Sequence, residues 1–173
     1  IFFIILKSET FHNMKTLILV RHAKSDWPTN TDDLDRPLRE CGHQDAPKMA
    51  KFLKSNEVKI DAFVTSPAKR TITTCRYFAE VFENKNIKKI EELYNASSTE
   101  FLELIENLDD SVENVAIFSH NNGITYFANS LTNENIEHMP TCSVVAFKID
   151  TKNWAEFKKS AKEFLFFYKP KEI

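Results

Sequence analysis

Four residues of this 173-residue chain, two arginines and two histidines, have the side chains that phosphoryl chemistry requires. They are Arg21, His22, Arg70 and His120. A guanidinium group binds phosphate oxygens through paired, charge-assisted hydrogen bonds. An unprotonated imidazole can attack phosphorus and form a covalent intermediate, while a second, protonated imidazole can donate to a phosphate oxygen. Together these side chains predict a site that binds a phosphoryl group and transfers it through a phosphohistidine.

Each of these residues stands at or near the end of an apolar run that is typical of a buried strand. We expect strands at 15–20, 61–65 and 115–119, and a helix at 66–82 that carries Arg70 on its first turn. Because ligands bind outside the carboxyl ends of parallel strands, the four side chains are expected to share one crevice. An arginine fits poorly at the positive end of a helix, so Arg70 also predicts a nearby anion. Taken singly, a histidine at a strand end is more often a turn or surface residue, and an arginine on a first helical turn is usually a surface residue.

The rest of the chain alternates between helical and extended patterns. A three-layer αβα sandwich is therefore expected, with a mainly parallel sheet and helices on both faces in one α/β domain. Helices are expected at 40–56, 66–82, 98–108 and 122–131, with Ser66 as the cap of the second and Pro67 at its first position, and Pro47 tolerable only near the start of the first. Further strands are expected at 87–93, 142–149 and, at an edge, 164–168, while 154–159 fits either a helix or a strand.

Composition excludes several other classes of site. With only two glycines the chain cannot form a Walker loop or a dinucleotide-binding GxGxxG motif. Three cysteines without a CxxC pair indicate neither a disulfide framework nor a zinc site, and Cys75 and Cys142 are expected in the core. A formal charge of −2 gives no sign of nucleic-acid binding. We therefore expect a cytoplasmic protein with no cofactor, no metal and no nucleic-acid or membrane partner.

The first residues stand apart from this pattern. The apolar stretch at 1–6 is too short to span a bilayer, and no secretory signal is recognisable around it. We interpret residues 1–13 as an extension outside the fold and 14–173 as the domain. The alternative is an additional edge strand at 1–6.

Several segments resemble the histidine phosphatase superfamily, which includes the phosphoglycerate mutases. The first strand end resembles its RHG or RHA signature, the 65–71 segment its SSPxxRAxxTA motif, and the third strand end its second-histidine motif. Two more segments resemble the small SixA-type phosphohistidine phosphatases. In order, the five segments are 19–25 (LVRHAKS), 35–38 (DRPL), 65–71 (TSPAKRT), 92–94 (ELY) and 118–121 (FSHN). The resemblance covers roughly residues 14–170.

This resemblance implies a phosphoglycerate mutase-like fold and assigns roles by motif. His22 is implied as the phosphorylated nucleophile, and Arg21, Arg70 and His120 as the phosphate pocket. Asn121 is implied as a further substrate-binding residue. Alanine replaces the glycine that commonly follows the nucleophile, and an Asn pair stands where HNP is common, so the loop after His120 is expected to differ in shape.

Two assignments remain open from sequence. Arg36 matches the arginine of the RPL segment and either reaches the phosphate or the substrate, or pairs with Asp33 or Asp35 to order its loop. Glu92 lies where larger relatives carry an acidic proton donor, and it is alternatively a surface residue beside Glu91.

The length of the chain bears on the substrate. Only about thirty residues separate Arg70 from the helix at 98–108, too few for a lid domain, so we expect an open crevice. This favours a metal-independent phosphatase that hydrolyses phosphohistidine on a protein. The alternatives are a small-molecule phosphomonoesterase or mutase of the same superfamily, and a non-catalytic phosphate-binding module. The sequence does not indicate the oligomeric state.

Overall fold

The computed structural model describes residues 14–173; the two interpretations of residues 1–13 lie outside these described residues. Six strands form one sheet in the order β3-β2-β4-β1-β5-β6. The pairs β1–β4, β4–β2 and β2–β3 are parallel, whereas β5 is antiparallel to both β1 and β6. The strands are β1 (Lys15–Arg21), β2 (Ala62–Thr65), β3 (Ile87–Lys89), β4 (Asn114–Ser119), β5 (Val144–Ile149) and β6 (Lys162–Tyr168).

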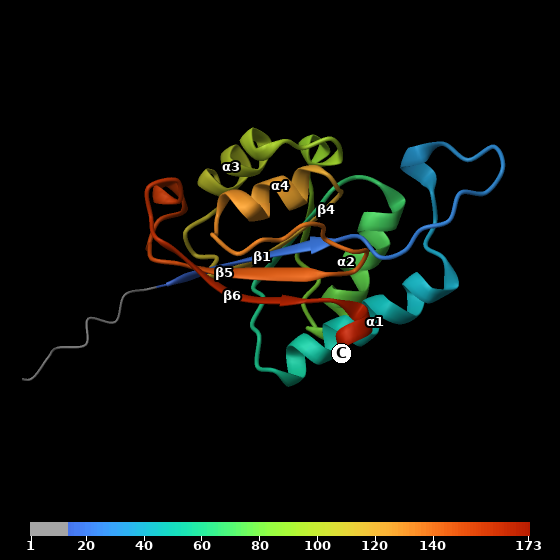
Figure 1. Cartoon of the computed structure of the whole chain (residues 1–173), viewed down its shortest axis with the longest axis horizontal. Coiled ribbons are helices and arrows are strands. Elements are labelled where there is room, and N and C mark those ends of the chain that lie inside the picture. The colour runs from blue at the N-terminus through green and yellow to red at the C-terminus, as the bar shows by residue number, and fades with distance from the viewer. Residues whose placement is uncertain (1–13) are drawn as a thin grey trace, which may run out of the picture.

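Helices cover both faces of this sheet, which confirms the expected mainly parallel, three-layer α/β fold (Figure 1). Alternate residues of β1 show why: Leu17 and Leu19 pack in one apolar cluster with α3 and α4, while Ile18 and Val20 pack in the other with α1 and α2. The helices are α1 (Glu40–Ser55), α2 (Lys69–Val81), α3 (Ser98–Glu106) and α4 (Gly123–Ser130). Short 3-10 turns are η1 (Asp33–Asp35), η2 (Glu91–Tyr94), η3 (Trp154–Glu156) and η4 (Pro170–Glu172).

Some element boundaries differ from those expected. Helix α2 begins at Lys69 with Ala68 as its N-cap, not with Ser66 as the cap. The Ser66 hydroxyl contacts His120 Nε2 at 2.7 Å and also accepts from the Ala68 backbone N–H at 3.4 Å. The strand expected at 87–93 ends at Lys89, and the turn η2 replaces its second half. Helix α1 continues through Pro47, which therefore lies in the helix interior.

The two glycines hold helices closely against neighbouring loops. A Cβ atom on Gly42 of α1 would lie 2.2 Å from the Lys24 carbonyl oxygen, and one on Gly123 would lie 1.9 Å from that of Ala96. The Lys24 segment follows the end of β1, and Ala96 lies between the turn η2 and helix α3. Cys75 and Cys142 are buried as predicted. Within residues 14–173, no helix has the length and apolar character to cross a membrane.

Candidate active site

Three parallel strands end at one edge of the sheet, and their ends bring the predicted site together. Arg21 closes β1 opposite Ser119 of β4. The backbone N–H of His22 donates to the Ser119 carbonyl at 3.1 Å, and that of Ser66, just after β2, donates to the neighbouring strand. As a result the rings of His22 and His120 lie with their centroids 5.1 Å apart.

His22 is held in the tautomer that a nucleophile requires. Its Nδ1 lies 2.8 Å from the Ala23 carbonyl oxygen, which can only accept, so Nδ1 carries the hydrogen and Nε2 keeps its lone pair. The Ala23 backbone is itself anchored, because its N–H donates to Thr74 Oγ1 at 2.9 Å. Burial, together with the positive charges of Arg70 and Arg21, lowers the pKa of His22 to about 3, against the opposing effect of the Ala23 hydrogen bond. The imidazole is therefore neutral at physiological pH.

His120 is fixed through both ring nitrogens. Its Nε2 lies 2.7 Å from Ser66 Oγ and 3.3 Å from Thr71 Oγ1, and its Nδ1 lies 3.4 Å from Arg70 Nη2. Because a guanidinium only donates, Nδ1 accepts and Nε2 carries the hydrogen. Burial, together with the neighbouring His22 and Arg70, lowers the pKa of His120 to about 3, against the opposing charge of Asp33. The ring is thus neutral in this structure, whereas the sequence interpretation assigned it a proton; protonation at Nδ1 requires an added negative charge nearby.

Arg21 and Arg70 each contain a buried hydrogen-bond donor that has no partner in the part of the chain that the structure describes. The Nε atoms of both are buried and have no hydrogen-bond partner among residues 14–173. A buried donor without a partner costs about 1–3 kcal/mol. An anion at the strand ends would supply the missing acceptors. Arg21 is further held by its Nη1, which donates to the Met139 carbonyl at 2.7 Å and lies 3.1 Å from His138 Nε2.

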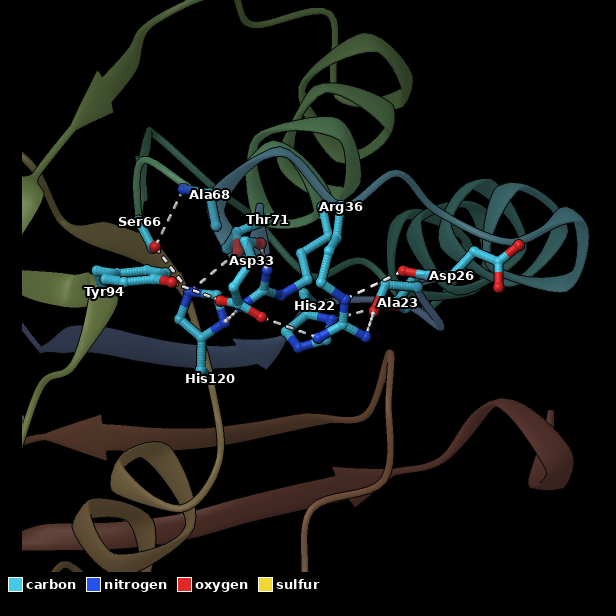
Figure 2. Close-up of polar contacts among 12 residues, drawn as sticks. His22, Ala23, Asp26, Asp33, Arg36, Ser66, Ala68, Thr71, Tyr94 and His120 are labelled. Atoms are coloured by element: carbon cyan, nitrogen blue, oxygen red, sulfur yellow. Dashed lines mark hydrogen bonds and ion pairs between the residues drawn. The ribbon is translucent and has the colours of Figure 1, made fainter. Parts of the chain in front are cut away.

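The loop between β1 and α1 supplies the anion that the position of Arg70 predicts. Asp33 Oδ2 accepts from Arg70 Nη2 at 2.9 Å and from the Tyr94 hydroxyl at 2.5 Å, and Oδ1 accepts from Arg36 Nη1 at 3.0 Å. Figure 2 shows the Asp33 carboxylate between Tyr94 and Arg36, beside the histidine rings. Partial burial acts to raise the pKa of Asp33, but the hydrogen bonds from Tyr94, Arg36 and Arg70 outweigh it and hold the pKa well below the usual range. The carboxyl is ionised.

Arg36 orders this loop, which is the second of the two roles left open by the sequence. Besides its ion pair with Asp33, its Nε donates to the Asp26 carbonyl at 3.0 Å and its Nη2 to Ser25 Oγ at 2.9 Å. The guanidinium also stacks on the ring of Trp27, 4.0 Å from its centroid. The loop lies close over the strand ends, and only 7% of His22 is exposed, so the crevice is less open than expected.

Glu92 lies outside this cluster. It is exposed and lines a surface hollow with residues of β3 and α3, including Lys88 and Glu103. The turn η2 directs Tyr94 into the site instead, where its ring packs edge-on against His120 with centroids 5.6 Å apart. The segment at 92–94 therefore does contribute a side chain to the site, but this side chain is Tyr94 and not Glu92.

Asn121 lies beside the pocket and braces a neighbouring loop. Its Nδ2 donates to the Met139 carbonyl at 3.1 Å and lies 3.0 Å from His138 Nδ1, while its Oδ1 accepts from Thr125. His138 therefore sits between Asn121 and Arg21. Nothing in the sequence singled it out, since it follows no motif and lies 117 positions from Arg21. Residues 14–173 contain no cluster of three or more His, Cys, Asp or Glu side chains suited to a metal ion.

Comparisons with known proteins agree with this geometry. Residues 17–101 match the family profile of the histidine phosphatase superfamily (branch 1). An uncharacterized chloroplastic protein of Arabidopsis thaliana is 29% identical over 153 residues, covering 82% of this chain and 70% of its own length. A SixA structure from Agrobacterium tumefaciens, provisionally assigned as a phosphohistidine phosphatase, has a TM-score of 0.77 at 24% identity over 90% of this chain and 98% of its own.

A structure of the protein histidine phosphatase SixA in complex with tungstate has a TM-score of 0.78 at 19% identity, covering 91% of this chain and 98% of its own. At these identities, both SixA structures show that the fold is shared. The family match extends from β1 to the start of α3 and includes His22 and Arg70. The fold, the match of residues 17–101 and the site are those of the histidine phosphatase superfamily.

Proposed function

We propose that this protein is a metal-independent phosphatase that forms a phosphohistidine at His22 and hydrolyses phosphohistidine on a partner protein. One observation carries the proposal. A neutral, buried imidazole with its Nε2 lone pair available lies at the same sheet edge as two arginines whose Nε–H groups are buried without partners. This arrangement combines a nucleophile with donors for the oxygens of the group it attacks.

In the first step, His22 Nε2 attacks phosphorus, and the bond from phosphorus to the leaving group breaks with its electron pair going to the leaving group. The Nε–H groups of Arg21 and Arg70 donate to the phosphoryl oxygens, whose charge is spread in the transition state. In the second step, water attacks phosphorus, the P–N bond to His22 breaks, and inorganic phosphate is released. The positive charge that a metal would otherwise supply comes from the guanidinium groups.

The state of the carboxyl groups favours a leaving group that departs without a proton donor. Asp33, the carboxyl in contact with the pocket, is held ionised and cannot donate a proton. Glu92 is exposed on a different surface. An alkoxide leaving group needs general-acid help far more than an imidazole nitrogen does. The geometry therefore favours phosphohistidine or an aryl phosphate over an alkyl phosphate ester.

The surroundings of the site favour a protein substrate. Between α2 and α3 the chain holds only β3 and η2, so no additional domain stands over the strand ends from that side. A phosphorylated side chain on another protein requires such access. The three cysteines are free thiols, and on that basis we also propose a reducing setting such as the cytoplasm.

The test compares leaving groups at constant enzyme. A phosphohistidine-bearing protein and an aryl phosphate are expected to be hydrolysed at least about 100-fold faster, in kcat/KM, than alkyl phosphates, since no acid assists the poorer leaving groups. Activity is expected to persist in a chelator. His22→Asn should abolish turnover, while His43→Asn, a histidine on α1 that bonds Tyr77 outside the site, should leave it unchanged.

Three results would contradict the proposal. Equal rates with alkyl and aryl phosphates would require a proton donor at the leaving group. Loss of activity in a chelator would require a metal. A small phosphorylated metabolite that is hydrolysed faster than every phosphohistidine protein tested would favour the small-molecule alternative.

A further inference from the structure

We propose that Asp33 is a resident anion that competes with the phosphoryl group for Arg70, so that substrate displaces it and its return promotes release of inorganic phosphate. The inference rests on the proposed phosphate-binding role of the pocket. It adds a residue outside the predicted catalytic set and gives that residue a defined effect on phosphate affinity.

The contacts of Asp33 take up the part of Arg70 that is best suited to phosphate. Arg70 Nη2 donates to Asp33 Oδ2 at 2.9 Å, and Arg70 Nη1 donates to the Asp33 backbone carbonyl. Both terminal nitrogens of the guanidinium are thus engaged by one residue. Carboxylates and phosphates offer the same paired oxygens to a guanidinium fork. A phosphoryl group can use both terminal nitrogens of Arg70 only if Asp33 gives up its place.

The two partners differ in how freely they can move. The Arg70 side chain is only 6% exposed and belongs to α2, where its backbone carbonyl accepts from the Thr74 hydroxyl at 2.7 Å. The Asp33 side chain is 36% exposed and belongs to a three-residue turn that has no side-chain cap. An exchange of partners would therefore move Asp33 and leave Arg70 in place. The buried Arg70 Nε has no partner among the described residues, so Arg70 keeps one unsatisfied donor while Asp33 is bound.

The other contacts of Asp33 keep it close when it is displaced. Arg36 holds Oδ1 at 3.0 Å and is itself bonded to Ser25 and Asp26 of the same loop. Arg36 therefore tethers the Asp33 carboxylate to the loop when Asp33 leaves Arg70. A tethered carboxylate of this kind returns at high effective concentration, which favours departure of a product phosphate from Arg70.

Competition of this kind lowers the apparent affinity for phosphate. The apparent Kd equals the intrinsic Kd divided by the fraction of molecules in which the site is available. If Asp33 occupies Arg70 in about nine molecules of ten, removing its charge tightens phosphate binding about tenfold. A residue that only positions Arg70 would have the opposite effect, because its loss would weaken binding. The sign of the change separates the two roles.

The experiment is calorimetric titration with inorganic phosphate, together with product inhibition of aryl phosphate hydrolysis. Asp33→Asn is expected to bind phosphate about tenfold more tightly and to show an equal fall in the inhibition constant. Asp35→Asn is the matched control: this exposed residue of the same turn carries the same charge, and its variant is expected to stay within about twofold of wild type. Tyr94→Phe, which removes one hydrogen bond to Asp33 and keeps the ring, is expected to tighten binding by less than Asp33→Asn.

Unchanged or weaker phosphate binding by Asp33→Asn would overturn the inference, as would equal tightening by Asp35→Asn, which would indicate a long-range charge effect. If Asp33→Asn does not fold, Tyr94→Phe decides, and unchanged or weaker binding by that variant overturns the inference. If the wild type and all variants fail to bind phosphate, both the inference about Asp33 and the proposed function are refuted. If the wild type binds phosphate and the variants bind it no more tightly, the proposed function is retained and only the role of Asp33 is refuted.

Discussion

Replacement of Arg70 gives the most quantitative prediction about the pocket. Arg70 is 5% exposed, and its Nε has no partner among residues 14–173. A bound phosphoryl group is expected to accept at least two hydrogen bonds from this guanidinium. Hydrogen bonds to charged groups contribute about 1.5–3 kcal/mol each, so Arg70→Ala should lose about 3–6 kcal/mol of transition-state stabilisation. Because each factor of ten corresponds to about 1.4 kcal/mol, kcat/KM should fall about 10²- to 10⁴-fold.

The assay is steady-state hydrolysis of an aryl phosphate by variants shown to be folded by circular dichroism. Arg70→Lys should recover only part of the loss, since an ammonium group keeps the charge but cannot form the fork. Arg39→Ala is the matched control: Arg39 is 54% exposed and pairs with Asp26 at 3.5 Å, so its loss should change kcat/KM by less than about twofold. A folded Arg70→Ala protein with activity within tenfold of wild type would refute the assignment of Arg70 to the phosphate.

Three further predictions concern the acid, the backbone and the histidines. Glu92→Gln should keep kcat within about twofold of wild type because Glu92 is exposed away from the pocket, and a tenfold loss would restore it as a proton donor. Gly123→Ala should lower the free energy of unfolding by about 1–3 kcal/mol, because the added Cβ would lie 1.9 Å from the Ala96 carbonyl oxygen. An unchanged melting temperature would contradict this close approach. His22 and His120 have pKa values of about 3 in the folded protein, against about 6.5 in the unfolded chain. Between these two pH values the unfolded chain binds more protons than the folded protein. The free energy of unfolding should therefore fall as the pH decreases, by at most about 1.4 kcal/mol per histidine for each pH unit. Urea unfolding at pH 7 and pH 5 measures this slope, and replacing both histidines with asparagine should flatten it.

The sheet and the four central residues could be predicted because their signals are local. The runs at 15–20, 61–65 and 115–119 are short, apolar and uninterrupted, and parallel strands must end at a common edge. The arginines and histidines after these runs therefore had to meet, although they come from separate parts of the chain. The position of Arg70 on a first helical turn also predicted an anion, and the structure supplies Asp33 in that place.

The surroundings of the pocket could not be predicted in the same way. The loop at 26–37 has no repeating apolar pattern, so nothing in it indicates that Asp33 reaches Arg70 across 37 positions and Tyr94 across 61. The tautomers of the two histidines depend on a carbonyl and a serine hydroxyl whose positions follow only from the packed fold. Burial also reverses the expected charge of His120, because the energy of desolvation depends on side chains brought in by other elements.

Trapping the phosphoryl group on the enzyme tests the central claim most directly. Rapid acid-free quenching during turnover, followed by peptide mass spectrometry, should find one phosphoryl group on the peptide that contains His22, with the acid lability typical of a phosphohistidine. The group should be absent from His22→Asn and present in His43→Asn. A phosphoryl group on another residue, or continued turnover by His22→Asn, would contradict the account.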